Sequence, residues 1–113
     1  MKKIEAIIRP TLLFQVVDAM RKLPGIPGII IYDIKGFGKS RAMTAKDKIT
    51  EEFINYIPRK KLELVVNDGQ ADDVVDLILR MARTGNTGDG KIFVSPVEDC
   101  IKIRDGAKGE EAI

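Results

Sequence analysis

The chain has 113 residues and a mass of 12.5 kDa, which is enough for one domain. Its 19 Lys and Arg residues against 17 Asp and Glu give a net charge of +2, too balanced for a nucleic-acid binder with a basic face, and no apolar run approaches the roughly 20 residues of a membrane span. With no His and a single cysteine, Cys100, the chain lacks Ser-His-Asp catalysis, His metal sites and an internal disulfide, so we expect a cytoplasmic protein that is not an enzyme.

The first part of the chain predicts a strand, a helix and a second strand. Residues 2–8 read Lys-Lys-Ile-Glu-Ala-Ile-Ile, which is typical of a buried strand. After a break at 9–11, apolar residues recur at helical spacing and predict an amphipathic helix. Its expected buried face is Leu12, Leu13, Val16, Val17 and Met20. Glycines between 25 and 28 mark a turn, and the aliphatic run 29–34 predicts the next strand.

A long polar connection follows this unit. The 19 residues between Gly38 and Pro58 far exceed the roughly two to five that join strands in a hairpin. Connections of this length are often functional, so we predict a loop that contacts a partner protein, the alternative being a solvated loop without a role. The charged residues expected to make that contact are Arg41, Lys46, Asp47, Lys48, Glu51 and Glu52.

The second unit repeats the first. Residues 60–66 carry the pattern of 2–8 and predict a buried strand, and after a break at 67–69 a second amphipathic helix follows. Its expected buried face is Val74, Val75, Ile78, Leu79 and Ala82. Asp72 and Asp73 are expected in its first turn and Arg80 and Arg83 in its last, where they suit the helix dipole.

Two strand–helix–strand units in tandem predict an α+β, ferredoxin-like βαββαβ fold, with a four-stranded antiparallel sheet and both helices on one face. The fourth strand is expected over 91–94. A short final strand over 100–104 would alternate apolar residues inside with basic residues outside, and a loose polar tail would follow over 105–113.

The glycine-rich stretch from Gly85 to Lys91 matches the start of a P-loop, but Ile92 replaces the Mg²⁺-binding Ser or Thr, and a strand follows where a P-loop needs a helix. Its N–H groups can still form a nest for an anion, with Lys91 as a nearby charge. Lys102 and Arg104 would share the outward face of the final strand and favour a polyphosphate. The alternative is a tight turn with solvated cations.

The stretch from Thr84 to Phe93, Thr-Gly-Asn-Thr-Gly-Asp-Gly-Lys-Ile-Phe, resembles a signature of the P-II nitrogen regulatory proteins. The opening residues 1–10, the sequence Lys-Gly-Phe-Gly at 35–38 and the final Ala-Ile at 112–113 are similar to that family too. The resemblance implies a single domain, 1–113, with a T-loop at about 38–58, a B-loop at about 84–91 and a C-terminal segment at about 100–113.

The resemblance also implies a homotrimer that binds ATP or ADP competitively between subunits, and that in many members also binds Mg²⁺ and 2-oxoglutarate. The T-loop would dock onto an ammonium channel, an enzyme or a regulator, so a membrane would be involved only through a transporter partner. The nucleotide positions carried over from the family are Gly36, Phe37, Gly38, Lys39, Glu63, Val65, Thr84, Gly88, Asp89, Gly90, Lys91, Lys102 and Arg104. Lys102 and Arg104 would come from a neighbouring subunit.

Departures from the family pattern shape the expected function. Arg59 matches a position that contacts a 2-oxoglutarate carboxylate, but Ser40 stands where a glutamine helps to hold Mg²⁺ and 2-oxoglutarate, so their binding is predicted to be weak or absent. Glu52 stands where enterobacterial members of the family carry a T-loop tyrosine that is uridylylated, so we expect no uridylylation at that position. Modification of the nearby Tyr56 instead is not favoured, because that residue is expected at the start of the next strand. The hypotheses are a nitrogen-status regulator, a divergent sensor of energy status that controls another transporter or enzyme, and, less favoured, a weak ATPase that uses Lys91 and a metal.

Overall fold

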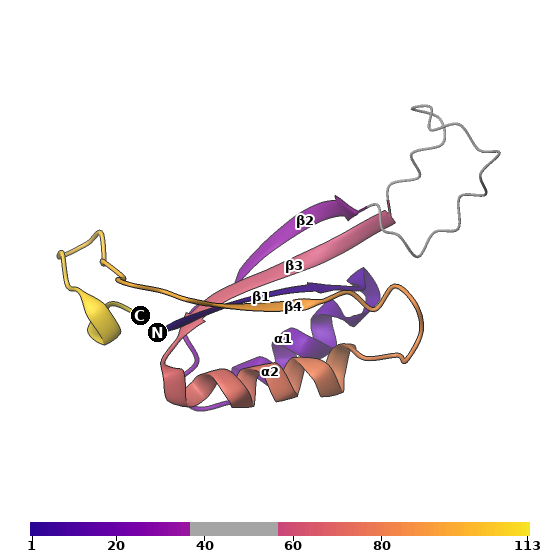
Figure 1. Ribbon diagram of the computed structural model, residues 1–113, viewed down its shortest axis with the longest axis horizontal. Coiled ribbons are helices and arrows are strands. Elements are labelled where there is room, and N and C mark those ends of the chain that lie inside the picture. Colours follow the sequence, from indigo (N-terminus) through magenta and orange to yellow (C-terminus); the bar gives the residue numbers. More distant parts are fainter. Residues whose placement is uncertain (37–56) are drawn as a thin grey trace.

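The computed structural model describes residues 1–36 and 57–113 (Figure 1). Its elements in chain order are β1 (Lys2–Ile8), the 3-10 helix η1 (Pro10–Leu12), α1 (Leu13–Arg21), β2 (Ile30–Gly36), β3 (Ile57–Val66), α2 (Asp68–Ala82), β4 (Ile92–Pro96) and the 3-10 helix η2 (Gly109–Ala112). Within the described residues, no helix is long and apolar enough to cross a bilayer.

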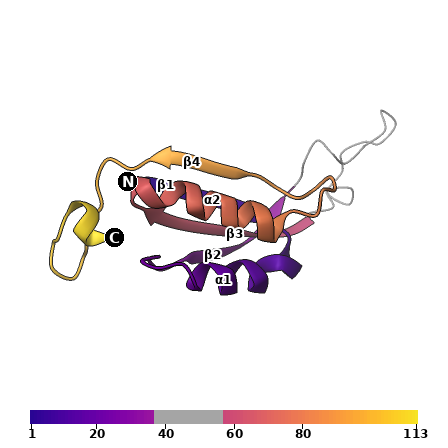
Figure 2. The ribbon, with the colours of Figure 1, turned by 90° about the horizontal axis from the view of Figure 1, so that it is seen from below.

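The four strands form one antiparallel sheet in the order β2-β3-β1-β4. Both helices lie against the same face of this sheet (Figures 1 and 2). The predicted ferredoxin-like fold is therefore confirmed. The opposite face, which no helix covers, is called the open face below.

Burial alternates along β1 and β3, because successive side chains of a strand point to opposite faces of a sheet. The register pairs Ile4 with Leu64 and Ala6 with Leu62 on the helix side, and Glu5 with Glu63 on the open face. Both strands are thus half-buried, which corrects the expectation that they are buried throughout.

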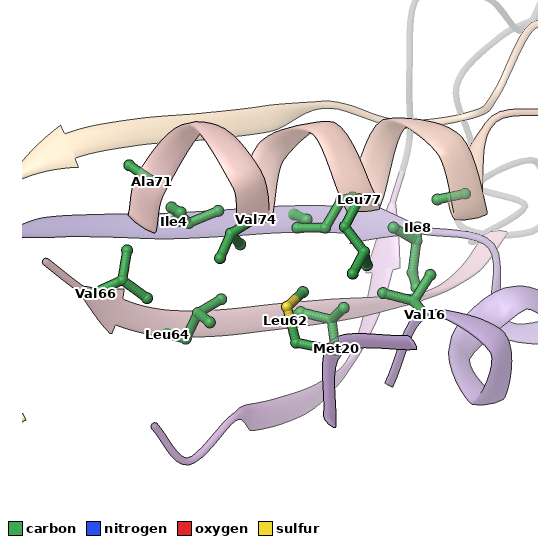
Figure 3. Close-up of a cluster of buried hydrophobic side chains, with 13 residues drawn as sticks. Ile4, Ile8, Val16, Met20, Leu62, Leu64, Val66, Ala71, Val74 and Leu77 are labelled. Atoms are coloured by element: carbon green, nitrogen blue, oxygen red, sulfur yellow. The ribbon is translucent and has the colours of Figure 1, made fainter. Parts of the chain in front are cut away.

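The core lies between the sheet and the two helices (Figure 3). Each fully buried aliphatic side chain contributes about 1.5–3 kcal/mol through the removal of apolar surface from water. The buried cluster consists of Ile4, Ala6, Ile8, Val16, Met20, Leu62, Leu64, Val66, Ala71, Val74, Leu77, Ile78 and Ala82.

Helix α2 differs from its prediction in where it begins and in which face it buries. It begins at Asp68, after the extended N-cap residue Asn67, so the predicted first-turn residues Asp72 and Asp73 lie in its second turn. Leu77 is buried in place of Leu79, which is 39% exposed. The apolar residues of α2 cover a wide arc of its surface, so their spacing alone does not decide which of them face the sheet. Packing against the sheet selects the residues that are buried.

The predicted strand over 100–104 is not formed. Ile101 makes an isolated bridge with Lys108 across a tight turn, in which the N–H of Gly106 donates to Lys102 O at 2.8 Å. Gly106 has φ +73°, which turns the chain before a strand can extend, and Ile103 is fully exposed rather than inside. The tail is more ordered than expected because η2 forms within it.

The C-terminal segment, residues 97–113, projects beyond the end of the sheet at which β1 begins (Figures 1 and 2). The glycine loop, residues 84–91, lies at the opposite end, between the end of α2 and the start of β4. The sheet therefore separates the glycine loop from the C-terminal segment of the same chain.

Candidate nucleotide site

Backbone packing fixes the glycine loop against β1. Gly85, Gly88 and Gly90 have φ values of +84°, +98° and +91°, a region that side chains rarely adopt. At Gly90 a side chain is also excluded by space, since its Cβ would lie 1.8 Å from the carbonyl oxygen of Ile7. The Ile7 N–H donates to Lys91 O at 2.9 Å, so the end of the loop continues directly into the sheet.

Asp89 closes the loop from within. Its carboxylate accepts hydrogen bonds from the N–H groups of Thr84 and Gly85 at 2.9 and 2.8 Å, from the Thr84 hydroxyl, and from Arg9 Nε at 3.1 Å. These donors, Thr84 first among them, hold the pKa of Asp89 well below its ordinary value. Asp89 and Thr84, both predicted to contact nucleotide, thus shape the loop.

Two arginines lie against the outside of the loop. Arg9 Nη2 donates to Thr87 O at 2.9 Å, and Arg59 Nη2 donates to Gly88 O at 3.2 Å. A side chain at Gly88 would come within 3.3 Å of both guanidinium groups, so they lie close together. With the exposed Lys91, they place three cationic side chains at this end of the molecule, of which Arg9 is ion-paired with Asp89.

Sequence reasoning placed Arg59 in the site but missed Arg9. Arg9 directly follows β1, and β1 neighbours β4 in the predicted fold, so the end of β1 must lie beside the glycine loop that precedes β4. The predicted topology thus indicates that Arg9 lies near the loop, whereas the contacts of its side chain come only from the structure.

Glu63 belongs to a charged cluster on the open face. Its carboxylate lies 3.1 Å from Lys3 Nζ, which also lies 3.1 Å from Glu5, and it accepts a hydrogen bond from Tyr32. Lys3 Nζ lowers the pKa of Glu63, while Glu63 raises the pKa values of Lys3 and of Tyr32. The ammonium of Lys61 lies 3.5 Å from Glu5 and 4.9 Å from the centre of the Tyr32 ring.

The structure divides the predicted nucleotide residues into two groups. One group, at the glycine-loop end, contains Gly36 and Thr84 to Lys91, with Arg59 beside them. Along β3, Glu63 lies about 13 Å from Arg59 and Val65 about 20 Å, from the rise of an extended strand. Val65 pairs with Lys3, close to where β4 ends and the C-terminal segment begins.

Lys102 and Arg104 belong to that second group, within the C-terminal segment. They therefore do not lie beside the glycine loop of the same chain, and their arrival from a neighbouring subunit stays a prediction. Strand β4 runs between the loop and the segment and carries the chain away from Lys91. A site that uses both groups needs two copies of the chain.

Several predicted residues lie outside the described part of the chain. They are Phe37, Gly38, Lys39 and Ser40 of the nucleotide and 2-oxoglutarate set, and Arg41, Lys46, Asp47, Lys48, Glu51 and Glu52 of the partner-binding loop. Among residues 1–36 and 57–113, no three His, Cys, Asp or Glu side chains group in a way that could hold a metal ion.

Comparison with known proteins assigns the chain to a family. The family model of the nitrogen regulatory protein P-II matches residues 1–107. The chain is 46% identical to a nitrogen regulatory protein P-II of Nostoc punctiforme and 44% identical to that of Synechocystis, in both cases over 113 residues and the full length of both chains. The chain belongs to the P-II family.

The solved structures agree with this assignment. A crystal structure of Arabidopsis thaliana PII bound to citrate superposes with a TM-score of 0.79 at 39% identity, over 99% of this chain and 91% of that one. The described part of the chain therefore has the P-II fold. Proteins of this family are named as regulators of nitrogen metabolism, which places the chain among signalling proteins.

Proposed function

We propose that this P-II protein senses adenine nucleotides as a homotrimer. In this proposal ATP or ADP binds between the glycine loop of one subunit and the C-terminal segment of the next, and the protein controls a partner through its 38–58 loop. The observation that carries the proposal is the division of the nucleotide residues between opposite ends of the sheet.

The chemistry of the glycine-loop end supports a polyphosphate ligand. Glycine conformations with positive φ let successive N–H groups point into one concavity, and Lys91 adds an exposed ammonium. Arg9 and Arg59 add positive potential to the same end. Lys102 and Arg104 of a neighbouring subunit would complete the binding of the phosphates.

The open face supports assembly. Ile30, Tyr32 and Phe93 are each 41–53% exposed there, around the charged cluster of β1 and β3. The sheet also ends in two different edge strands, β2 and β4, within the described residues. Head-to-tail contacts between unlike surfaces close into rings, and a three-membered ring would cover these open faces.

For 2-oxoglutarate we propose weak or no binding. Arg59 and Arg9 offer charge to a carboxylate, but the hydroxyl of Ser40 is too short to replace a glutamine as an Mg²⁺ ligand, and Mg²⁺ tolerates little departure from octahedral geometry. Calorimetric titration of 2-oxoglutarate into protein with Mg-ATP should show binding in Ser40→Gln and none in Ser40→Ala. Micromolar binding by the unsubstituted protein would contradict this part of the proposal.

A second candidate follows from the same departures. Ser40 and Glu52 favour a sensor of the ATP-to-ADP balance that acts on a different transporter or enzyme, without uridylylation. The weak ATPase has less support, and steady-state hydrolysis with saturating Mg²⁺ tests it.

Partner proteins can be captured from the native cell in parallel with ATP and with ADP. The identity of the retained partner then distinguishes a nitrogen-status regulator from a sensor of energy status that acts on a different transporter or enzyme. The nucleotide proposal itself is tested by calorimetry together with the mass of the particle in solution. ATP and ADP should compete for three sites per trimer, and a lack of binding at millimolar nucleotide would overturn it.

A further inference from the structure

An apolar side chain stands at the tip of the C-terminal segment. Ile103 is 101% exposed and lies between Lys102 and Arg104. The turn that carries it is held by backbone hydrogen bonds from Lys102 N to Ala107 O and from Gly109 N to Cys100 O, at 2.8 and 2.9 Å. The segment thus presents an isoleucine in a defined turn, away from the body of its own subunit.

An apolar pocket of about 390 Å³ borders the glycine loop on the helix side. Its apolar walls are Ile8, Val75, Ile78, Leu79, Ala82 and Ile92. Asp89, Gly90 and Lys91 form its border with the loop, and Arg83 completes its rim. A pocket of this kind has the size and character of a binding site, and its wall includes the partly exposed Leu79.

We propose that Ile103 of one subunit occupies this pocket of the next subunit and acts as a positioning residue for the nucleotide site. The inference rests on the proposed head-to-tail trimer. An isoleucine seated beside Lys91 would bring its sequence neighbours, Lys102 and Arg104, to the glycine loop, because adjacent residues lie about 3.8 Å apart. One contact then explains both the exposed isoleucine and the delivery of the two cations.

Charge makes this contact depend on the ligand. Docking gathers Lys102 and Arg104 near Lys91 and Arg83, and like charges at such separations repel. A nucleotide polyphosphate neutralises the group. Docking of Ile103 should therefore be stronger when ATP is bound, so the C-terminal segment and the nucleotide stabilise each other.

Disulfide trapping tests the contact directly. In a Cys100→Ser background, Ile103→Cys combined with Leu79→Cys should give covalent trimers under mild oxidation, and more quickly with ATP. Ile103→Cys combined with Arg80→Cys is the control, since exposed Arg80 lies on the same helix but does not line the pocket. Equal trapping in both pairs, or trapping in neither, would overturn the proposal.

Nucleotide affinity supplies a second readout. Ile103→Ser should weaken ATP binding about tenfold without affecting folding, since the side chain makes no buried contact in its own subunit. Phe14→Ser is the control, because Phe14 is also exposed, at 79%, but lies on α1. The ATP affinity of this variant should equal that of the unsubstituted protein. If the unsubstituted protein binds no nucleotide, the proposed function fails, while disulfide trapping still decides whether Ile103 docks.

Discussion

Lys91 is the exposed cation at the end of the glycine loop, and in the proposed site it contacts phosphate oxygens. Lys91→Ala should weaken ATP and ADP binding about ten- to a hundredfold, since a hydrogen bond to a charged group is worth roughly 1.5–3 kcal/mol. Calorimetry provides the measurement. Lys22→Ala removes another exposed charge, directly after α1, and should leave the affinity unchanged.

Asp89 stabilises the same loop as an anion, which makes its contribution depend on pH. Because the pKa of Asp89 is lower in the folded protein than its ordinary value of 3.8, the stabilisation is complete well above pH 4 and is lost as the pH falls below it. Asp89→Asn should therefore lower the melting temperature most at neutral pH. The difference from the unsubstituted protein should shrink below pH 4, and a difference of constant size down to pH 2.5 would contradict the assignment.

At the scale of an element, α2 offers a matched pair of leucines. Leu77 is 3% exposed and packs in the core, whereas Leu79 is 39% exposed at the pocket. Leu77→Ala should lower the free energy of unfolding by about 2–5 kcal/mol, because it removes buried surface and leaves a cavity. Leu79→Ala should cost about 1 kcal/mol or less. Urea denaturation measures both, and a loss for Leu79→Ala as large as that for Leu77→Ala would contradict the difference in burial between the two leucines.

The two helices also show how far a local pattern determines an element. In α1 the expected residues Val16 and Met20 are buried, because most apolar residues of this short helix lie on one side, with the exposed Phe14 as the exception. In α2 apolar residues occur around much of the helix, so the contacts with α1 and β1 select Leu77 over Leu79.

For the whole molecule, a site shared between two subunits predicts complementation. Lys91→Ala damages the glycine-loop half of every site in its trimer, and Arg104→Ala damages the C-terminal half. Mixed trimers, formed by unfolding and refolding the two variants together, contain sites with Lys91 from one chain and Arg104 from the other. About one site in four should then regain normal ATP affinity if the chains assemble at random.

The measurement is a calorimetric comparison of the refolded mixture with each variant refolded alone. A mixture that binds ATP no better than the separate variants would show that each site is built within one chain.

The sequence by itself determined the four strands and two α-helices of the main fold, the ferredoxin-like topology and the residues of the glycine loop. Apolar residues recur with a period of two along a strand and of 3.6 along a helix, and glycines mark turns. Each of these patterns spans only a few neighbouring residues, so it can be read from the sequence. Residues such as Gly90 and Lys91 could therefore be identified directly, and so could the family.

Only the tertiary structure decided where those residues lie relative to one another. It brought Arg9 to the loop through the pairing of β1 with β4, and it placed Lys102 and Arg104 at the other end of the sheet. The turn at Gly106 also replaced a strand that alternation alone had favoured. Distances between residues across a sheet depend on the direction and register of the strands and on the turns between them. Local sequence patterns do not specify these features.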